Sequence, residues 1–208
     1  MITDPGIDQY ILNLIPPRDE VLAEMEAYAA EHRVPIIGPA VAALLAQLVH
    51  ISGAKRIFEL GSAIGYSTIW LARAAGAGAE VHYSDGDPAS ADRARDYFRR
   101  AGVADRIQVH VSDALQALAS VPGSFDLIFN DVDKEGYPAV LKVAPGRLKK
   151  GGLFITDNTL WHGKVLNPQD EETRAVVEFD SQIFQDKRLI SSIVPLRDGV
   201  VIAWKREN

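Results

Sequence analysis

Charged and amide side chains follow two segments of the sequence that have the composition of buried strands. The run "FDLIFND" (125–131) ends in Asp131, and "GLFITDN" (152–158) ends in Asp157 and Asn158. Three hard oxygen ligands without histidine or cysteine suit Mg²⁺, Ca²⁺ or Mn²⁺ and not zinc. Two unpaired carboxylates held close together would raise one another's pKa, and a divalent cation removes that conflict. These residues therefore predict a site for a divalent cation.

A lysine and a further carboxylate stand directly after the first of these ligands. In "NDVDKEGY" (130–137), Asp133 and Lys134 follow Asp131. A lysine beside a cation site can accept a proton from a bound hydroxyl group. The alternative is a surface ion pair between Lys134 and a neighbouring aspartate, an interaction usually worth less than about 1 kcal/mol. We prefer the cation site because the second strand end supplies ligands with no other partner evident in the sequence.

A glycine-containing loop precedes these motifs. The run "ELGSAIGYS" (59–67) places Gly61 after a predicted strand and Gly65 at the start of a predicted helix, where the backbone can approach an anionic group. Ala63 stands where the G-x-G-x-x-G motif of dinucleotide-binding enzymes has its second glycine. Asp85 ends the next strand, about where an acidic residue reaches ribose hydroxyls. The glycine loop and Asp85 together indicate a nucleoside that carries a non-phosphate group. Taken alone, the loop is about equally compatible with a tight turn that binds no ligand.

Strand and helix patterns alternate along the chain and predict how these residues are positioned. Such alternation implies an α/β fold, with a parallel sheet covered by helices on both faces, and ligands bind such sheets at the carboxyl ends of the strands. The segment 189–205 reads as two strands joined by a hairpin at Arg197-Asp198-Gly199. The other predicted strands are 55–60, 79–85, 106–113, 125–131 and 152–158, and the predicted helices are 16–33, 38–53, 67–75, 88–102, 114–121 and 169–185.

Length and composition limit the classes of protein. The chain of 208 residues is expected to form one domain, with a helical segment 1–53 and an α/β core 54–208. The absence of cysteine excludes disulfides, thiolate metal sites and a cysteine nucleophile. The first residues lack a signal-peptide pattern, and no apolar run approaches the roughly 20 residues of a membrane span. The net charge of −6 argues against nucleic-acid binding, so we expect a cytoplasmic protein that binds neither membrane nor nucleic acid.

Five segments of the sequence together resemble a known enzyme family. The segments "FELGSAIGYSTIWLA", "YSDGDP", "SDAL", "FDLIFNDVDKEGY" and "GGLFITDNTLWHG" resemble the class I S-adenosylmethionine-dependent O-methyltransferases. Within these, the pairing of D-x-D-K-x-x-Y with a later D-N-T-L-W resembles the cation-dependent catechol and caffeoyl-coenzyme A O-methyltransferases. The resemblance covers roughly residues 35 to 204. It implies a Rossmann-like class I methyltransferase fold, with a mostly parallel seven-stranded sheet and an antiparallel last strand.

The resemblance also implies cofactors and residue roles. S-adenosylmethionine and a divalent cation, Mg²⁺ foremost, are the implied cofactors, and Lys134 matches the catalytic base. Asp131, Asp157 and Asn158 match the ligands of the cation. The matched cofactor contacts are Glu59, Gly61, Ser62 and Ser67 at the methionine end, Asp133 at the amino-acid part, Asp85 at the ribose, and Asp113 and Ala114 at the adenine.

The implied activity is methylation of one hydroxyl of a vicinal-diol phenol of the catechol or caffeoyl type. The alternatives are a nicotinamide-dependent oxidoreductase and a non-catalytic cofactor-binding protein. A homodimer is expected, and the N-terminal helices either cover the substrate or form the dimer contact. Arg197 departs from the family, in which glycine often precedes "DG", and it could attract a carboxylate if it faces the substrate. His162 follows D-N-T-L-W, near an expected substrate contact.

Overall fold

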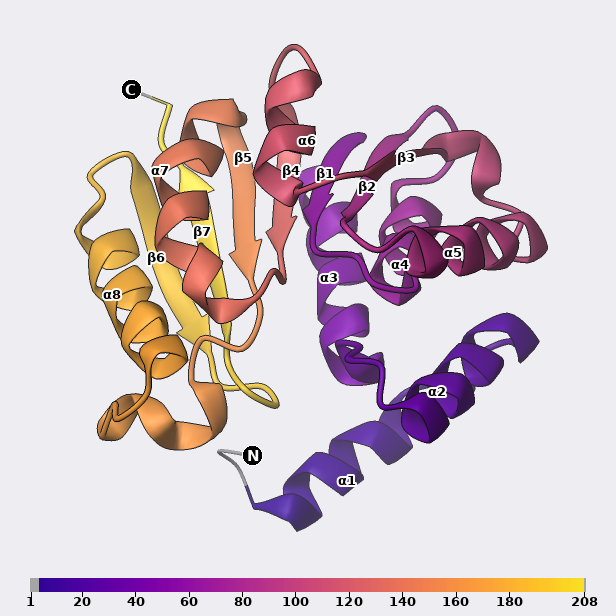
Figure 1. Cartoon of the computed structure of the whole chain (residues 1–208), viewed down its shortest axis with the longest axis horizontal. Coiled ribbons are helices and arrows are strands. Elements are labelled where there is room, and N and C mark those ends of the chain that lie inside the picture. Colours follow the sequence, from indigo (N-terminus) through magenta and orange to yellow (C-terminus); the bar gives the residue numbers. More distant parts are fainter. Residues whose placement is uncertain (1–3, 208) are drawn as a thin grey trace.

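A seven-stranded sheet runs through the centre of the structure, a computed structural model that describes residues 4–207 (Figure 1). Its strand order is β3-β2-β1-β4-β5-β7-β6, with β1 to β5 parallel and β7 antiparallel to both of its neighbours. The predicted class I methyltransferase fold is therefore confirmed. The strands are β1 (Arg56–Leu60), β2 (Glu80–Asp85), β3 (Ile107–Val111), β4 (Phe125–Asn130), β5 (Leu148–Thr156), β6 (Leu189–Val194) and β7 (Val200–Lys205).

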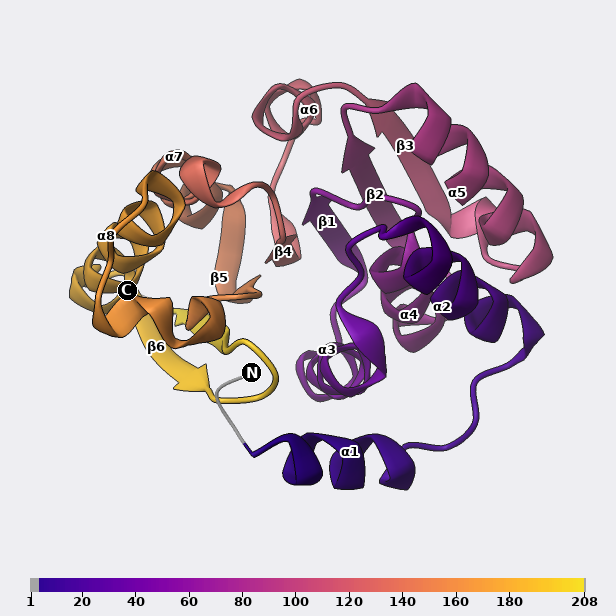
Figure 2. The ribbon, with the colours of Figure 1, turned by 60° about the horizontal axis from the view of Figure 1, so that its bottom comes forward.

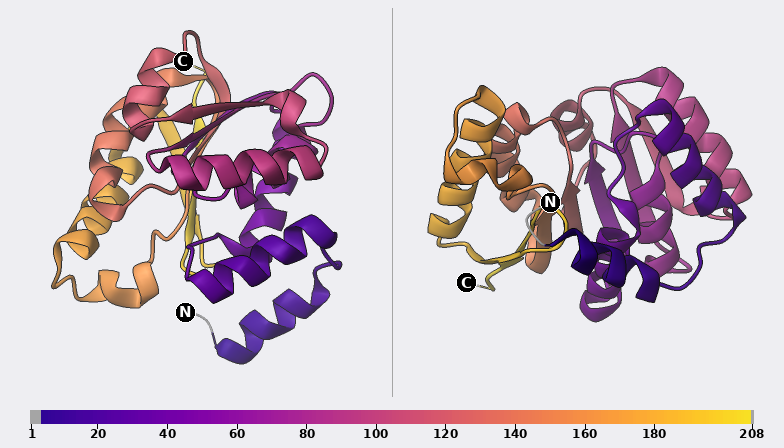
Figure 3. Two further views of the ribbon diagram at one scale, coloured as in Figure 1. Left: turned by 45° about the vertical axis from the view of Figure 1, so that its right-hand side comes forward. Right: turned by 90° about the horizontal axis from the view of Figure 1, so that it is seen from below.

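Helices cover both faces of the sheet, which Figure 3 shows on either side of the strands when the molecule is seen from below. Helices α2 to α5 share one apolar core with the sheet, and α6 to α8 share the other. Central strands buried on both faces need continuous apolar runs, and "LIFN" of β4 is buried throughout. The helices are α1 (Pro5–Leu14), α2 (Glu20–His32), α3 (Gly38–Ser52), α4 (Tyr66–Ala75), α5 (Pro88–Arg100), α6 (Ala114–Ser120), α7 (Tyr137–Arg147) and α8 (Glu171–Gln185), with short 3₁₀ helices η1 (Ala104–Arg106), η2 (Lys134–Gly136) and η3 (Trp161–Leu166).

The N-terminal segment differs from its prediction in one element. Helices α2 and α3 were predicted, and α2 begins where Asp19 accepts a hydrogen bond from the Leu22 amide at 3.0 Å. Helix α1 was not predicted, and it lies along the outside of the molecule with no buried residue (Figure 2). Met1–Thr3 of the predicted segment 1–53, and Asn208, lie outside the described residues. No described helix is both long enough and apolar enough to cross a bilayer.

Strand β5 begins four residues earlier than the sequence predicts. The segment "LKKG" carries two exposed lysines and lacks a strand pattern, yet Leu148 pairs with Phe125 of β4. The register between these strands then shifts before Leu127 pairs with Leu153. A shift of this kind bends the strand locally and is set by the neighbouring strand, so it leaves no periodic signal in the sequence.

A buried carboxylate on α8 makes the stability of the fold depend on pH. Burial raises the pKa of Asp180 to about 7, and its Oδ1 has no hydrogen-bond partner in the described chain. Because the pKa of Asp180 is higher in the folded state than in the unfolded state, protonation of this carboxyl favours folding. Its contribution to the free energy of unfolding is complete below about pH 4 and is lost as the pH rises through 7. We expect Asp180→Asn to raise the free energy of unfolding by on the order of 2 kcal/mol at pH 8 and to change it little at pH 4. Urea unfolding at both pH values measures this difference, and an equal effect at both would contradict it.

Candidate functional site

A cavity of about 700 Å³ opens at the carboxyl ends of the strands. It spans the point where the strand order reverses, between β1 and β4, and α/β sheets bind ligands at such switch points. Of the twelve predicted site residues, nine line this cavity, and the exceptions are Glu59, Ser62 and Ser67. The structure therefore brings the predicted cation ligands, the predicted base and most of the predicted cofactor contacts to one place.

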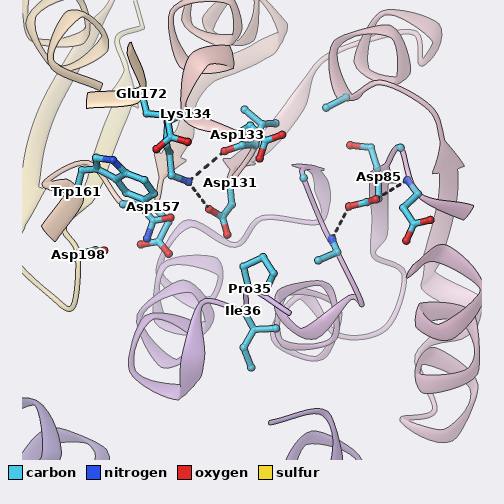
Figure 4. Close-up of a pocket in the computed structure, with 18 of the residues that line it drawn as sticks. Pro35, Ile36, Asp85, Asp131, Asp133, Lys134, Asp157, Trp161, Glu172 and Asp198 are labelled. Carbon is cyan, nitrogen blue, oxygen red and sulfur yellow. Dashed lines mark hydrogen bonds and ion pairs between the residues drawn. The ribbon is translucent and has the colours of Figure 1, made fainter. Parts of the chain in front are cut away.

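The register of the sheet explains why the two aspartates meet. Residue Leu60 pairs with Asn130, which pairs in turn with Thr156, so the three strands end side by side. The amide of Asp131 then donates to the Leu60 carbonyl at 2.8 Å, and the amide of Asp157 donates to the Asn130 carbonyl at 3.1 Å. Each aspartate is thus the first residue past its strand. Figure 4 shows their carboxylates turned toward the same part of the cavity.

Both carboxylates are strongly influenced by burial. Asp157 is 1% exposed, and neither of its carboxylate oxygens has a hydrogen-bond partner among the described residues. Burial raises the pKa of Asp131 and of Asp157, and the negative charge of Asp131 raises that of Asp157 further. A buried carboxylate without partners is costly unless a positive charge joins it. The pair is therefore prepared to receive a cation.

Asn158 supplies an amide next to this pair. It lines the cavity, and its backbone is left-handed, with φ of 58°. Asparagine tolerates this conformation better than most residues, which fits its place directly after β5. The described chain has no cluster of three or more histidine, aspartate and glutamate side chains suited to a metal. The donor set here is instead two carboxylates and one amide oxygen, which suits a hard cation.

Lys134 is held at the edge of the carboxylate pair. Its Nζ lies 3.5 Å from Oδ1 of Asp131 and 3.3 Å from the Val132 carbonyl, contacts drawn as dashed lines in Figure 4. The same nitrogen lies 5.0 Å from the ring centre of Tyr137 and 5.1 Å from that of Trp161, so two aromatic faces also stabilise its charge. The side chain is 8% exposed in total. The amine of Lys134 is therefore held in a fixed position, and a ligand reaches it from the cavity.

The loop after β1 packs directly against the first aspartate. A Cβ added at Gly61 would lie 2.6 Å from the Asp131 carbonyl oxygen, and its φ is +78°. Only glycine meets both conditions, so here the residue allows two loops to approach one another. Gly65 has a similar role, because a Cβ there would lie 2.5 Å from the Phe98 ring. The sequence predicts glycine at these positions because the backbone must approach a ligand. The close packing of each glycine against a neighbouring residue is a second reason, which the sequence does not reveal.

The far end of the cavity carries Asp85 at the end of β2. Its Oδ2 accepts a hydrogen bond from the Ala63 amide at 2.8 Å, and its Oδ1 accepts one from the Asp87 amide at 2.8 Å (Figure 4). Each carboxylate oxygen keeps further acceptor capacity, which suits hydroxyl groups such as those of a ribose. Asp113 and Ala114 line the same end, where Asp113 caps α6 by accepting from the Gln116 amide at 2.9 Å.

Three predicted cofactor contacts lie beneath the cavity and do not line it. Glu59, Ser62 and Ser67 are buried at the end of β1 and the start of α4. Burial raises the pKa of Glu59 to about 6, and nearby hydroxyls of Ser67, Thr68 and Ser62 lower it in part. Glu59 accepts a hydrogen bond from Thr68, while its Oε1 has no partner in the described chain. The backbone of Ser62 fixes the glycine loop: the Gly65 amide donates to the Ser62 carbonyl at 2.8 Å, and the Ser62 amide donates to the Ser84 carbonyl at 3.0 Å.

The cavity also contains residues that the sequence did not single out. Ile36 comes from the loop before α3 and Glu172 from α8. Nothing in the spacing of these two residues marks them, because the fold alone brings their elements together. Trp161, which ends the D-N-T-L-W motif, also lines the cavity, from η3. His162, expected near a substrate contact, lines the cavity, and its Nδ1 lies 2.9 Å from Oδ2 of the buried Asp198.

Comparison with known proteins gives a consistent assignment. The sequence model of a family described as O-methyltransferase matches residues 16–206. A catechol O-methyltransferase of Mycobacterium tuberculosis is 36% identical over 172 residues, which are 80% of this chain and 77% of the relative. A caffeoyl-CoA O-methyltransferase of Eucalyptus gunnii is 29% identical over 97% of this chain and 88% of its own. The crystal structure of a Bacillus cereus O-methyltransferase, solved in complex with SAH, is 30% identical, with a TM-score of 0.87 over 97% of both chains.

The matches favour a methyltransferase over the nicotinamide-dependent alternative. The family model spans nearly all of the chain, and the relatives resemble it in both sequence and fold. This protein belongs to the O-methyltransferase family.

Proposed function

We propose that this enzyme transfers a methyl group from S-adenosylmethionine to one hydroxyl of a vicinal-diol phenol, and that the reaction requires a divalent cation. The observation that carries the cation requirement is the pair of unpartnered oxygens on the buried Asp157, beside Asp131 and Lys134. The methyl donor is supported by the family and by the SAH complex of the Bacillus cereus relative. The acceptor class is supported by the names of the catechol and caffeoyl-CoA relatives.

The residues present fit both groups. Asp131, Asp157 and Asn158 offer oxygen donors to a cation from two adjacent strand ends, and Mg²⁺ prefers such ligands. Asp85 and Asp113 offer acceptors to a nucleoside at the opposite end of the cavity. The cavity volume falls within the range of small-ligand sites, about 300–1,000 Å³.

The chain's own residues then account for proton transfer. S-adenosylmethionine supplies an electrophilic methyl group, and a divalent cation lowers the pKa of a neighbouring phenol. Lys134 takes up the phenol proton at Nζ, where the resulting ammonium lies beside Asp131. S-adenosylmethionine, held at the end of the cavity that carries Asp85 and Asp113, would supply the methyl group to the phenolate oxygen and would itself leave as a thioether. The rings of Tyr137 and Trp161 and the Val132 carbonyl hold Nζ in place through this change.

Incubation of the purified enzyme with labelled S-adenosylmethionine and a catechol panel tests the proposal. Methylated product with Mg²⁺, and loss of product on chelation by EDTA, is the expected result. Full activity in EDTA would overturn the cation requirement, and no product from any vicinal diol would overturn the acceptor class. Fluorescence titration with NADH tests the oxidoreductase alternative, and no saturable binding is expected.

We also propose that the enzyme is a homodimer that pairs through α1. Ile7, Tyr10 and Leu14 recur at helical spacing and are 52%, 62% and 65% exposed. A helix of ten residues is shorter than the roughly 12–15 residues at which an isolated helix becomes stable, so α1 needs a packing partner.

Light scattering is expected to give about twice the mass of one chain. Tyr10→Asp should shift the mass toward the monomer, whereas Phe184→Asp, at a 52% exposed position on α8, should not. A monomeric wild type would contradict the proposal.

A further inference from the structure

The turn between β6 and β7 is fixed against the loop that follows the cation ligands. The Thr159 amide donates to the Gly199 carbonyl at 3.0 Å, and the Leu160 amide donates to the Asp198 carbonyl at 2.8 Å. The His162 amide donates to Oδ1 of Asp198 at 3.1 Å. Arg197 therefore occupies a fixed position, three residues before β7 begins at Val200.

Arg197 itself adopts a conformation that few arginines adopt. Its φ is 55°, in the left-handed region that costs a side chain about 1 kcal/mol relative to glycine. The side chain is also held, because Nη1 donates to the Ile36 carbonyl at 2.8 Å, across the mouth of the cavity. Arg197 is thus held both at its backbone, by the turn, and at the end of its side chain, by the hydrogen bond of Nη1. A strained residue held in this way indicates a role at a site.

The guanidinium has capacity for a further partner. It carries five N–H donors, and its one hydrogen bond to a described residue uses a single nitrogen. No carboxylate of residues 4–207 lies within 4 Å of it, whereas Lys134 already pairs with Asp131. Arg197 lines the same cavity as Asp131 and Asp157.

The position of Arg197 in the cavity separates it from the nucleoside end. Asp85 and Asp113 lie at β2 and β3, on one side of the cation ligands, and Arg197 lies at β7, on the other side. Seven aspartates and one glutamate line the cavity, against one lysine and one arginine in the part of the chain that the structure describes. An acidic acceptor would be repelled by such a lining unless a fixed positive charge met it. The planar guanidinium fork matches a carboxylate in a way that an ammonium does not.

We propose that Arg197 binds a carboxylate on the acceptor, so that the preferred substrates are vicinal-diol phenols that carry an acid group. This inference rests on the proposed function and names the acceptor class more closely. Arg197 acts on specificity: it holds the acid group while the diol lies at the cation ligands. Its loss removes binding that is equal in the ground and transition states, which raises KM with little change in kcat.

Two pairs of acceptors test the proposal: 3,4-dihydroxybenzoate with its neutral amide, and caffeate with its neutral amide. In at least one pair the wild type is expected to prefer the acid by tenfold or more in kcat/KM. Arg197→Met should lower this preference about tenfold to a hundredfold, mainly through KM of the acid. Arg197→Lys should retain part of it. Arg99→Met, an exposed arginine on α5, is the matched control and should retain all of it.

The outcomes separate this inference from the proposed function. Wild type that methylates acid and amide equally in both pairs, or an Arg197→Met enzyme whose loss is the same for acid and amide, would overturn the inference and leave the function standing. Calorimetric titration of each acid and its amide is independent of turnover. If no acceptor is methylated, the proposed function fails, and the inference still requires tighter binding of an acid than of its amide, lost in Arg197→Met.

Discussion

Replacing Asp157 by alanine is expected to lower methyl transfer by at least about 100-fold and to abolish stabilisation of the protein by Mg²⁺. In the proposed function Asp157, directly after β5, is a charged ligand of the cation, and loss of several kcal/mol of charge stabilisation corresponds to rate factors of this size. The fold should survive, because both carboxylate oxygens lack protein partners and only an unfavourable buried charge is removed. Activity with Mg²⁺ and the thermal midpoint with Mg²⁺ or EDTA measure the two effects.

Asp105→Ala is the matched control for this variant. Asp105 lies in η1 with its side chain 76% exposed, so its removal should leave both activity and the Mg²⁺-dependent shift of the midpoint unchanged. An Asp157→Ala enzyme that kept wild-type activity and the Mg²⁺ shift would show that the carboxylate is not a ligand. If the thermal midpoint of Asp157→Ala in EDTA were lower than that of the wild type in EDTA, Asp157 would instead be needed for folding.

Replacing Lys134 by methionine is expected to lower kcat by about 10²- to 10⁴-fold, the usual contribution of a general base. Methionine is an unbranched apolar side chain of similar length, and it removes the amine that lies over the rings of Tyr137 and Trp161. The residual rate should rise with pH, because a phenol ionises without a base as the pH approaches its own pKa of about 10. Steady-state kinetics between pH 7 and 10 measures both features.

Lys164→Met provides the comparison for this experiment. Lys164 also lies over the Trp161 ring, at 5.7 Å, but its side chain is 49% exposed and it does not line the cavity. Its removal should leave kcat within about threefold of the wild type, as for most exposed substitutions. If Lys134→Met retained a wild-type kcat, or if both variants lost activity equally, Lys134 would not be the base.

The framework of the site could be predicted because its signals are local. Aspartate directly after a strand marks the binding edge of a parallel sheet, and Asp85, Asp131 and Asp157 all lie there. The antiparallel β7 could be predicted from the turn signal "RDG" between two apolar runs. In each case a few adjacent residues decide the local structure, so the sequence pattern is sufficient.

The remainder of the site depends on contacts that no local pattern encodes. Arg197 donates to a carbonyl 161 residues away in the sequence, and His162 pairs with Asp198, 36 residues away. Glu59, which the resemblance matches to a cofactor contact, is fully buried and does not line the cavity, whereas Gly61 does. Helix α1 was not predicted, although Ile7, Tyr10 and Leu14 recur at helical spacing along it.

A crystal structure of the enzyme grown with Mn²⁺, with anomalous diffraction recorded at the manganese edge, would locate the cation. We expect one anomalous peak at the carboxyl ends of β4 and β5, within about 2.3 Å of side-chain oxygens of Asp131, Asp157 and Asn158. Oxygens that diverge with no ion between them, or a peak elsewhere on the protein, would contradict a cation-dependent methyl transfer at this site.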